Sequence, residues 1–116
     1  MSSTTISLLD EFTYHHVIAE TLGVSLVFYT GPDCGSCHHL RNVLNAYLQE
    51  CSGVSIFEVD AVVSAALVNE FNIFHLPSMF LYKDGQYHCE FHAEALPDKI
   101  HKAVEQALLL PAEEEP

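Results

Sequence analysis

Two cysteines separated by two residues, Cys34 and Cys37, are the positions whose type and spacing point most directly to chemistry. They follow an apolar run at residues 24–29 and a short turn, and they open a segment with helical period. The unpaired backbone N–H groups at a helix start, together with the helix dipole, favour an anion beside the first cysteine. Because the thiolate is the reactive form of cysteine, this spacing predicts a redox-active pair that can form a disulfide.

The elements that must hold this pair follow from the hydrophobic pattern. Residues 24–30 form a continuous apolar run, as in a strand buried on both faces, and an Asp-Gly pair at 84–85 separates two β-rich runs, as in a hairpin. Strands that alternate with helices predict a mainly parallel sheet covered on both faces, with an antiparallel edge. The predicted strands cover residues 4–8, 24–30, 54–60, 78–83 and 86–92, and the predicted helices cover residues 9–22, 34–50, 62–71 and 96–110.

Length and charge limit the class of protein. A chain of 116 residues is expected to form one domain, which we assign to residues 1–110, followed by an acidic, disordered tail at residues 111–116. The formal net charge of −12 argues against partners such as nucleic acid or an anionic membrane surface. Apolar runs in the sequence are all shorter than the ~18 residues that a membrane-spanning helix needs.

The N-terminal segment has neither the basic start nor the apolar core of a signal peptide, so we expect a cytoplasmic location. Structural disulfide frameworks are rare in the cytosol. We therefore interpret the four cysteines as one catalytic pair and two free thiols, Cys51 and Cys89, that act as small core hydrophobes.

Taken together, these features resemble the thioredoxin family over nearly the whole chain. One motif is Cys34-Gly35-Ser36-Cys37 at a strand-to-helix turn. The other is Leu76-Pro77-Ser78, followed by residues 79–86, which resembles the family's cis-proline strand and its Lys-x-Gly turn. The resemblance implies an α/β, thioredoxin-like fold with a central mixed sheet of four to five strands and helices on both faces.

The resemblance also implies roles for individual residues. Cys34 would be the attacking thiol, Cys37 the resolving thiol, and Pro77 a cis-proline packed against the disulfide, with the backbone at Leu76 pairing with substrate. The function implied is thiol–disulfide exchange on protein or small-molecule disulfides, with electrons from a reductase or a thiol and with no cofactor or metal. The residues predicted to contact substrate are Asp33, Gly35, Ser36, His75 and Leu76.

Three departures from the family pattern leave a second function open. Asp33 stands where the family commonly has Trp, and Gly35-Ser36 stands where its reductases usually have Gly-Pro. Phe28 and Ile56 occupy the positions of a buried Asp and its Lys partner. The alternative is a binding or adaptor module of the same fold whose cysteine pair is redox-sensing or vestigial.

Two other chemistries share residues with the cysteine pair. Cys34 to His38 also matches the attachment motif of c-type haem, with Met79 as a conceivable distal ligand, but the strand-rich pattern disfavours this reading. The cysteines could instead form a zinc site together with nearby histidines, which would require tetrahedral convergence of the ligands. The candidate histidines are His38, His39 and His75, and we predict no native metal site.

Overall fold

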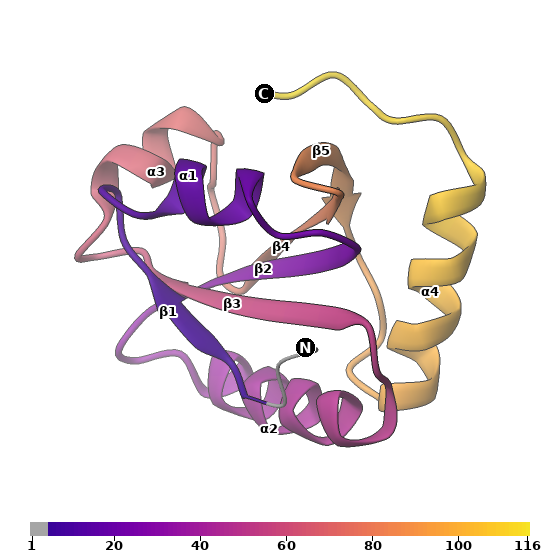
Figure 1. Ribbon diagram of the computed structural model, residues 1–116. Coiled ribbons are helices and arrows are strands. Elements are labelled where there is room, and N and C mark those ends of the chain that lie inside the picture. Colours follow the sequence, from indigo (N-terminus) through magenta and orange to yellow (C-terminus); the bar gives the residue numbers. More distant parts are fainter. Residues whose placement is uncertain (1–4) are drawn as a thin grey trace.

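The computed structural model describes residues 5–116, which form a five-stranded mixed sheet with helices on both faces (Figure 1). The predicted fold class is confirmed. Residues 1–4, which include the first residue of the predicted strand at 4–8, lie outside the described part. The strands are β1 (Ser7–Leu9), β2 (Val24–Thr30), β3 (Val54–Asp60), β4 (Ser78–Lys83) and β5 (Gln86–Phe91). The helices are α1 (Tyr14–Ala19), α2 (Gly35–Glu50), α3 (Ala65–Glu70) and α4 (Pro97–Leu109).

Strand β2 lies at the centre of the sheet, whose order is β1-β3-β2-β4-β5. It pairs in parallel with β3 and antiparallel with β4, and β4 pairs antiparallel with β5 through the predicted hairpin. The carboxyl end of β2 therefore leads directly into the loop that carries the cysteine pair, and a strand with a neighbour on each side holds that loop in place.

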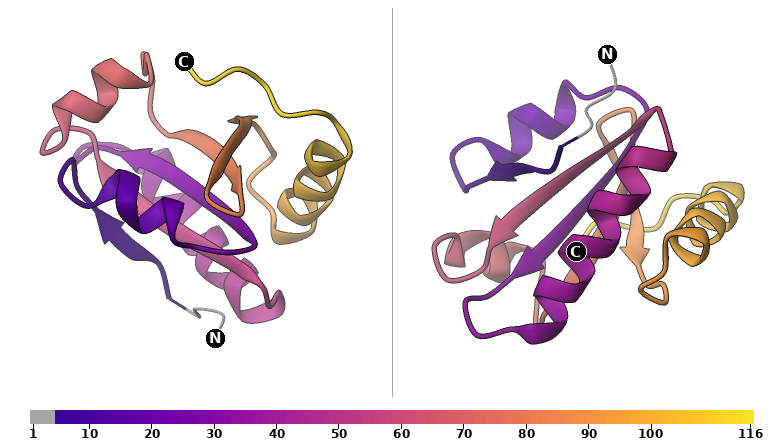
Figure 2. Two further views of the ribbon diagram at one scale, coloured as in Figure 1. Left: turned by 45° about the horizontal axis from the view of Figure 1, so that its top comes forward. Right: turned by 90° about the horizontal axis from the view of Figure 1, so that it is seen from below.

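Each face of the sheet carries its own hydrophobic core. Leu26 and Phe28 point to the face covered by α2 and α4, whereas Val27 and Tyr29 point to the face covered by α1 and α3. Successive side chains of a strand alternate between faces, so a strand buried on both sides is apolar at almost every position. The view from below brings α2 to the front of the sheet, with α4 beside β5 (Figure 2, right).

Two predicted helices are shorter in the structure because aspartates make local turns. The carboxylate of Asp10 accepts hydrogen bonds from the N–H groups of Phe12 and Thr13, and α1 begins only at Tyr14. Asp60 accepts from the N–H groups of residues 62 and 63 in the same way, and α3 begins at Ala65. Such side-chain bonds give the backbone an alternative to the helix that periodicity alone predicted.

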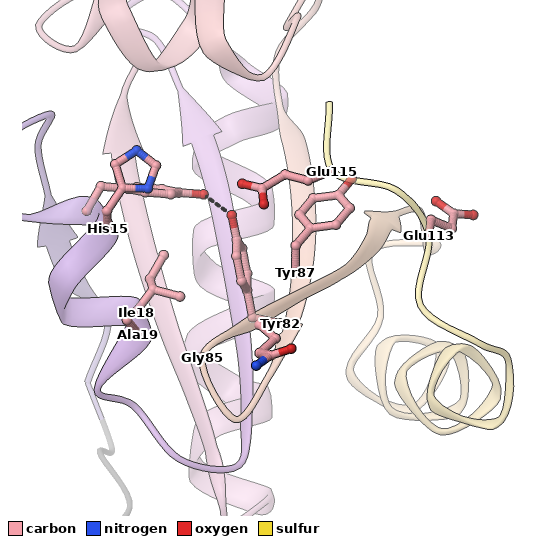
Figure 3. A pocket seen from close by; sticks show the side chains of 10 residues that line it. His15, Ile18, Ala19, Tyr82, Gly85, Tyr87, Glu113 and Glu115 are labelled. Carbon is pink, nitrogen blue, oxygen red and sulfur yellow. Dashed lines mark hydrogen bonds between the residues drawn. The ribbon is translucent and has the colours of Figure 1, made fainter.

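The C-terminal segment, residues 111–116, forms no helix or strand and runs from the end of α4 back past β5 (Figure 1). The N–H of Glu113 donates to the carbonyl of His88, 2.7 Å away. Glu113 and Glu115 border a cavity of about 490 Å³ between α1 and the β4–β5 hairpin, in which the hydroxyls of Tyr14 and Tyr82 are hydrogen-bonded (Figure 3). The division into a domain at 1–110 and a disordered tail stays a prediction.

Candidate active site

The cysteine pair lies at the start of α2, where the chain turns out of β2. Cys34 is the N-cap residue, and its sulfur accepts a hydrogen bond of 3.1 Å from the N–H of Cys37. Its carbonyl accepts from the N–H of His38. A helix N–H that has no carbonyl partner in the first turn and donates to the sulfur stabilises negative charge there, so the local backbone favours a thiolate when Cys34 is reduced.

The two sulfurs form a disulfide in this structure, with the Cα atoms of Cys34 and Cys37 5.2 Å apart. The two residues differ in accessibility: Cys34 is partly exposed, and Cys37 is fully buried. An attacking group from another molecule can therefore reach the sulfur of Cys34, whereas Cys37 is reached through Cys34.

The Leu76–Pro77 peptide bond is cis, as predicted. Pro77 and Ser36 line one cavity of about 230 Å³, which also includes His39, Met79 and further residues of β5 and the loop after it. The approach of the two loops is close: a Cβ atom on Gly31 would lie 2.9 Å from the side chain of Leu76. The fold thus brings together two motifs that are about forty residues apart in sequence.

The remaining predicted substrate-binding residues belong to the same two loops but do not line this cavity. Asp33, Gly35 and His75 are exposed, and Leu76 is partly buried. Space around Gly35 is open, since a Cβ there would meet no atom within 4 Å. The carbonyl of His75 accepts a hydrogen bond from Ser78, which ties the loop before Pro77 to the start of β4.

A buried carboxylate that the sequence analysis did not identify lies beneath the first turns of α2. Glu58 is 9% exposed on the same face of β3 as the core residue Ile56. Both of its oxygens accept hydrogen bonds from Arg41, with Nε 2.9 Å from Oε1, and Thr30 donates to Oε2 over 2.7 Å. Two features of the sequence could have indicated this pair: Glu58 is a charged residue at an inward position of a predicted strand, and Arg41 is the single arginine of the chain.

These contacts keep Glu58 ionised. The hydrogen bonds from Arg41 lower the pKa of its carboxyl below the usual range, against the opposing effect of burial, and the bond from Thr30 lowers it further. The same contact raises the pKa of the Arg41 guanidinium. Glu58 is therefore a fixed negative charge matched by Arg41, and it is poorly suited to accept a proton from a thiol.

Arg41 connects this ion pair to the helix start. Its Nη1 lies 2.9 Å from Nδ1 of His38, the residue that follows Cys37. A guanidinium can only donate, so Nδ1 of His38 is the acceptor and the hydrogen of the neutral ring lies on Nε2. The buried pair thus orients a side chain on the exposed rim of the cysteine site.

Within residues 5–116, no group of three or more His, Cys, Asp or Glu residues is arranged to hold a metal ion. None of the helices in the same residues is long and apolar enough to cross a membrane. The larger cavity beside α1 contains no cysteine and is separate from the site (Figure 3).

Sequence comparison assigns the family. The family model described as Thioredoxin matches residues 5–106. The chain belongs to the thioredoxin family. Its relatives include a rat protein named thioredoxin domain-containing protein 2, 31% identical over 78 residues, and a Chlamydia muridarum protein named thioredoxin, 33% identical over 64 residues. These matches cover 67% and 55% of this chain, but only 14% and 63% of the two relatives, so the chain spans less than two thirds of either one.

Solved structures show the same thioredoxin fold. A zinc-bound form of human ERp44 superposes with a TM-score of 0.76 at 16% identity, over 88% of this chain and 30% of that protein. A designed protein superposes with a TM-score of 0.75 at 17% identity, over 90% of this chain and 98% of the other. At these identities the likeness concerns the fold alone.

One departure from the thioredoxin pattern, at Phe28 and Ile56, lies next to the newly found ion pair. Phe28 and Ile56, at the positions expected for a buried Asp and Lys, are both fully buried in the core. Glu58 pairs with Phe28 in the register of β2 and β3, so a carboxylate stands one strand away from the expected position. Its partner is an arginine on α2 instead of a lysine on the sheet, and both charges are already matched.

Proposed function

We propose that this thioredoxin-family protein is a thiol–disulfide oxidoreductase that uses Cys34 and Cys37. The observation that carries the proposal is the unequal pair at the helix start: a partly exposed sulfur that accepts a helix N–H, and a buried partner within disulfide distance. The family match, which includes relatives named thioredoxin, supports the same reaction class.

In the reducing direction, the thiolate of Cys34 attacks one sulfur of a substrate disulfide. The Cys34–substrate bond forms as the substrate S–S bond breaks, and one substrate thiolate leaves. Cys37 then loses its proton and attacks the sulfur of Cys34, which releases the second substrate thiolate and leaves the Cys34–Cys37 disulfide. The substrate gains two electrons, and a reductase or small-molecule thiol must return two electrons to the protein.

The surroundings of Cys34 favour an extended disulfide-bearing segment as substrate. The exposed positions Asp33, Gly35 and His75 leave room for it, and the cavity between Ser36 and Pro77 can take a side chain next to the reacting sulfur. The backbone at Leu76 would pair with the substrate backbone. We place this reaction in the cytoplasm, where reduction of disulfides is the favoured direction.

The test is turnover of a disulfide-bonded protein substrate with dithiothreitol as electron donor, followed at pH 7. The parent should turn over, Cys34→Ser should be inactive, and Cys37→Ser should accumulate a mixed disulfide through Cys34. Cys51→Ser, which removes a free thiol at the other end of α2, is the matched control and should retain parental turnover. If the parent is no faster than dithiothreitol alone, the function is wrong and the binding or adaptor module becomes the better explanation.

A further inference from the structure

Cys51 lies at the opposite end of α2 from the Cys34–Cys37 pair, where α2 approaches the start of α4 (Figure 1). The sixteen residues of α2 separate the two places by roughly 24 Å along the helix axis. The sequence analysis interpreted Cys51 as a core residue, but the structure leaves it only partly buried. Its surroundings are therefore independent of the proposed exchange reaction.

The side chains around Cys51 form a nucleophile and base arrangement. Its sulfur lies 3.9 Å from Nδ1 of His101, and Nε2 of His101 lies 3.3 Å from a carboxylate oxygen of Glu105. A carboxylate accepts, so the hydrogen of the neutral ring lies on Nε2 and Nδ1 is left to accept a proton. A thiol within reach of a base that a third group orients is the pattern of an activated cysteine.

Tyr47 completes the arrangement. Its hydroxyl lies 3.3 Å from the same Nδ1 of His101. Burial raises the pKa of Tyr47, and interaction with Cys51 raises it further, so this side chain stays a phenol at neutral pH. A phenol remains a donor, and it can stabilise either the imidazole or a thiolate at Cys51.

A cavity of about 260 Å³ opens at this cluster, with Cys51, Tyr47 and His101 in its wall. Two carboxylate residues, Glu50 and Asp98, line the same cavity. Negative charge in the wall of the cavity repels anionic reagents and leaves access to small neutral ones. The size and charge of the cavity therefore select the kind of molecule that can react at Cys51.

We propose that Cys51 and His101 form a second thiol site, which a small uncharged hydroperoxide oxidises to a sulfenic acid. The proton of Cys51 passes to Nδ1 of His101, and Glu105 stabilises the resulting imidazolium. The thiolate sulfur attacks one peroxide oxygen, so that the S–O bond forms as the O–O bond breaks. With hydrogen peroxide, the sulfur is oxidised by two electrons, the peroxide is reduced, and the leaving hydroxide takes the imidazolium proton to become water.

The same chain contains a second free thiol, Cys89, for comparison. It is a free cysteine on β5, 9% exposed, and burial, with a further contribution from Glu113, raises its pKa. A buried thiol of raised pKa holds little thiolate at neutral pH. Because Cys89 is buried and Cys51 is partly exposed, faster reaction at Cys51 than at Cys89 shows that Cys51 is the accessible thiol, and variants of His101 and Glu105 test its activation.

The experiment uses the full chain with Cys34→Ser and Cys37→Ser, so that the dithiol gives no signal. The protein is exposed to hydrogen peroxide at pH 7 in the presence of dimedone, and mass spectrometry measures the adduct at each remaining cysteine. We expect Cys51 to react at least about tenfold faster than Cys89, in keeping with the dependence of reactivity on thiolate. Equal rates at the two cysteines would overturn the proposal.

Two variants test the base. His101→Gln should slow reaction at Cys51 by about tenfold or more, which is less than the ~10²–10⁴-fold typical of a positioned general base. Glu105→Gln, whose side chain is 65% exposed and so leaves folding intact, should slow it by a smaller factor. Unchanged rates in both variants would refute the role of His101.

A separate experiment tests the acidic cavity. The ratio of the alkylation rate by neutral iodoacetamide to the rate by anionic iodoacetate should be higher at Cys51 than for free cysteine. A lower ratio at Cys51 than for free cysteine would refute the role of the acidic cavity.

Discussion

The ion pair between Glu58 and Arg41 offers a sharp test of how this protein is stabilised beneath its cysteine site. Arg41→Met removes the guanidinium but keeps a long, helix-compatible side chain on α2. The carboxylate of Glu58 then keeps only its hydrogen bond from Thr30. An ionised group that is 9% exposed is left without its counter-charge, and we expect the folded state to lose stability.

The size of the expected loss in stability depends on how deeply the ion pair is buried. Removing one partner of a fully buried ion pair costs about 3–5 kcal/mol, and each charge-assisted hydrogen bond contributes about 1.5–3 kcal/mol. The Arg41 side chain is 31% exposed, so water can enter near the carboxylate that remains. We therefore expect Arg41→Met to lower the free energy of unfolding by about 2–3 kcal/mol, below the fully buried range. The double variant Arg41→Met/Glu58→Gln removes both charges and should stay within about 1 kcal/mol of the parent.

The assay is urea unfolding of the oxidised protein at several pH values. Lys102→Met, which removes an exposed positive charge from the same acidic chain, is the control for net charge and should have little effect. The folded-state pKa of Glu58 is lowered from an ordinary value of 4.5, so its contribution is present above pH 4.5 and is lost as pH falls through the folded pKa. The stability difference between parent and Arg41→Met should therefore shrink below pH 4.5.

Two outcomes would refute this reasoning. If Arg41→Met and Lys102→Met have equal effects, the pair acts only through net charge. If the double variant loses as much free energy of unfolding as the single variants Arg41→Met and Glu58→Gln lose when added together, Glu58 and Arg41 do not interact energetically, because coupled neighbours must deviate from additivity.

Three further predictions concern the cysteine site and the hairpin. In the reduced protein, iodoacetamide should label Cys34 faster than Cys37, because only Cys34 is accessible; faster labelling of Cys37 would reverse the assigned roles. A preformed mixed disulfide on Cys34 should decay faster as pH rises from 6 to 9, because the buried Cys37 must lose a proton before it attacks; a flat pH profile would contradict this. Gly85→Ala should lower the free energy of unfolding by about 1–3 kcal/mol, because φ at Gly85 is +79° and the added Cβ would lie 2.5 Å from the carbonyl oxygen of Ala19. Gly35→Ala, whose Cβ would lie in open space, should lower it less, and thermal unfolding of the two variants measures the difference.

The sequence by itself determined the order and type of the elements and the position of the cysteine pair. Strands at 24–30, 54–60 and 78–83 were predicted with the bounds that the structure has. Residues 24–30 form the continuous apolar run that a strand buried on both faces needs, and residues 54–60 place apolar side chains on both faces by alternation. The hairpin at Asp84 and Gly85 follows from local turn chemistry, and both residues adopt positive φ. The cysteine spacing, a local property of one turn, likewise identified the dithiol.

The bounds of the two short helices, α1 and α3, were not predicted correctly, because aspartate side chains compete with the helix for backbone N–H groups. The apolar period extends through residues 9–13 and 62–64, but the carboxylates of Asp10 and Asp60 hydrogen-bond the backbone there instead. Periodicity records which face of a segment is apolar and carries no information on where its backbone hydrogen bonds go. The helix ends therefore depended on side-chain bonds that only the folded chain displays.

Only the tertiary structure decided which distant side chains meet. Glu58 and Arg41 are seventeen residues apart and lie on different layers, and Cys51 and His101 are fifty residues apart on two packed helices. Hydrophobic pattern sets the layers, but the rotation of α2 and α4 on the sheet sets which polar groups face one another. For this reason the sequence identified the dithiol, whereas the ion pair beneath it and the second thiol site emerged from the packing of α2 against β3 and α4.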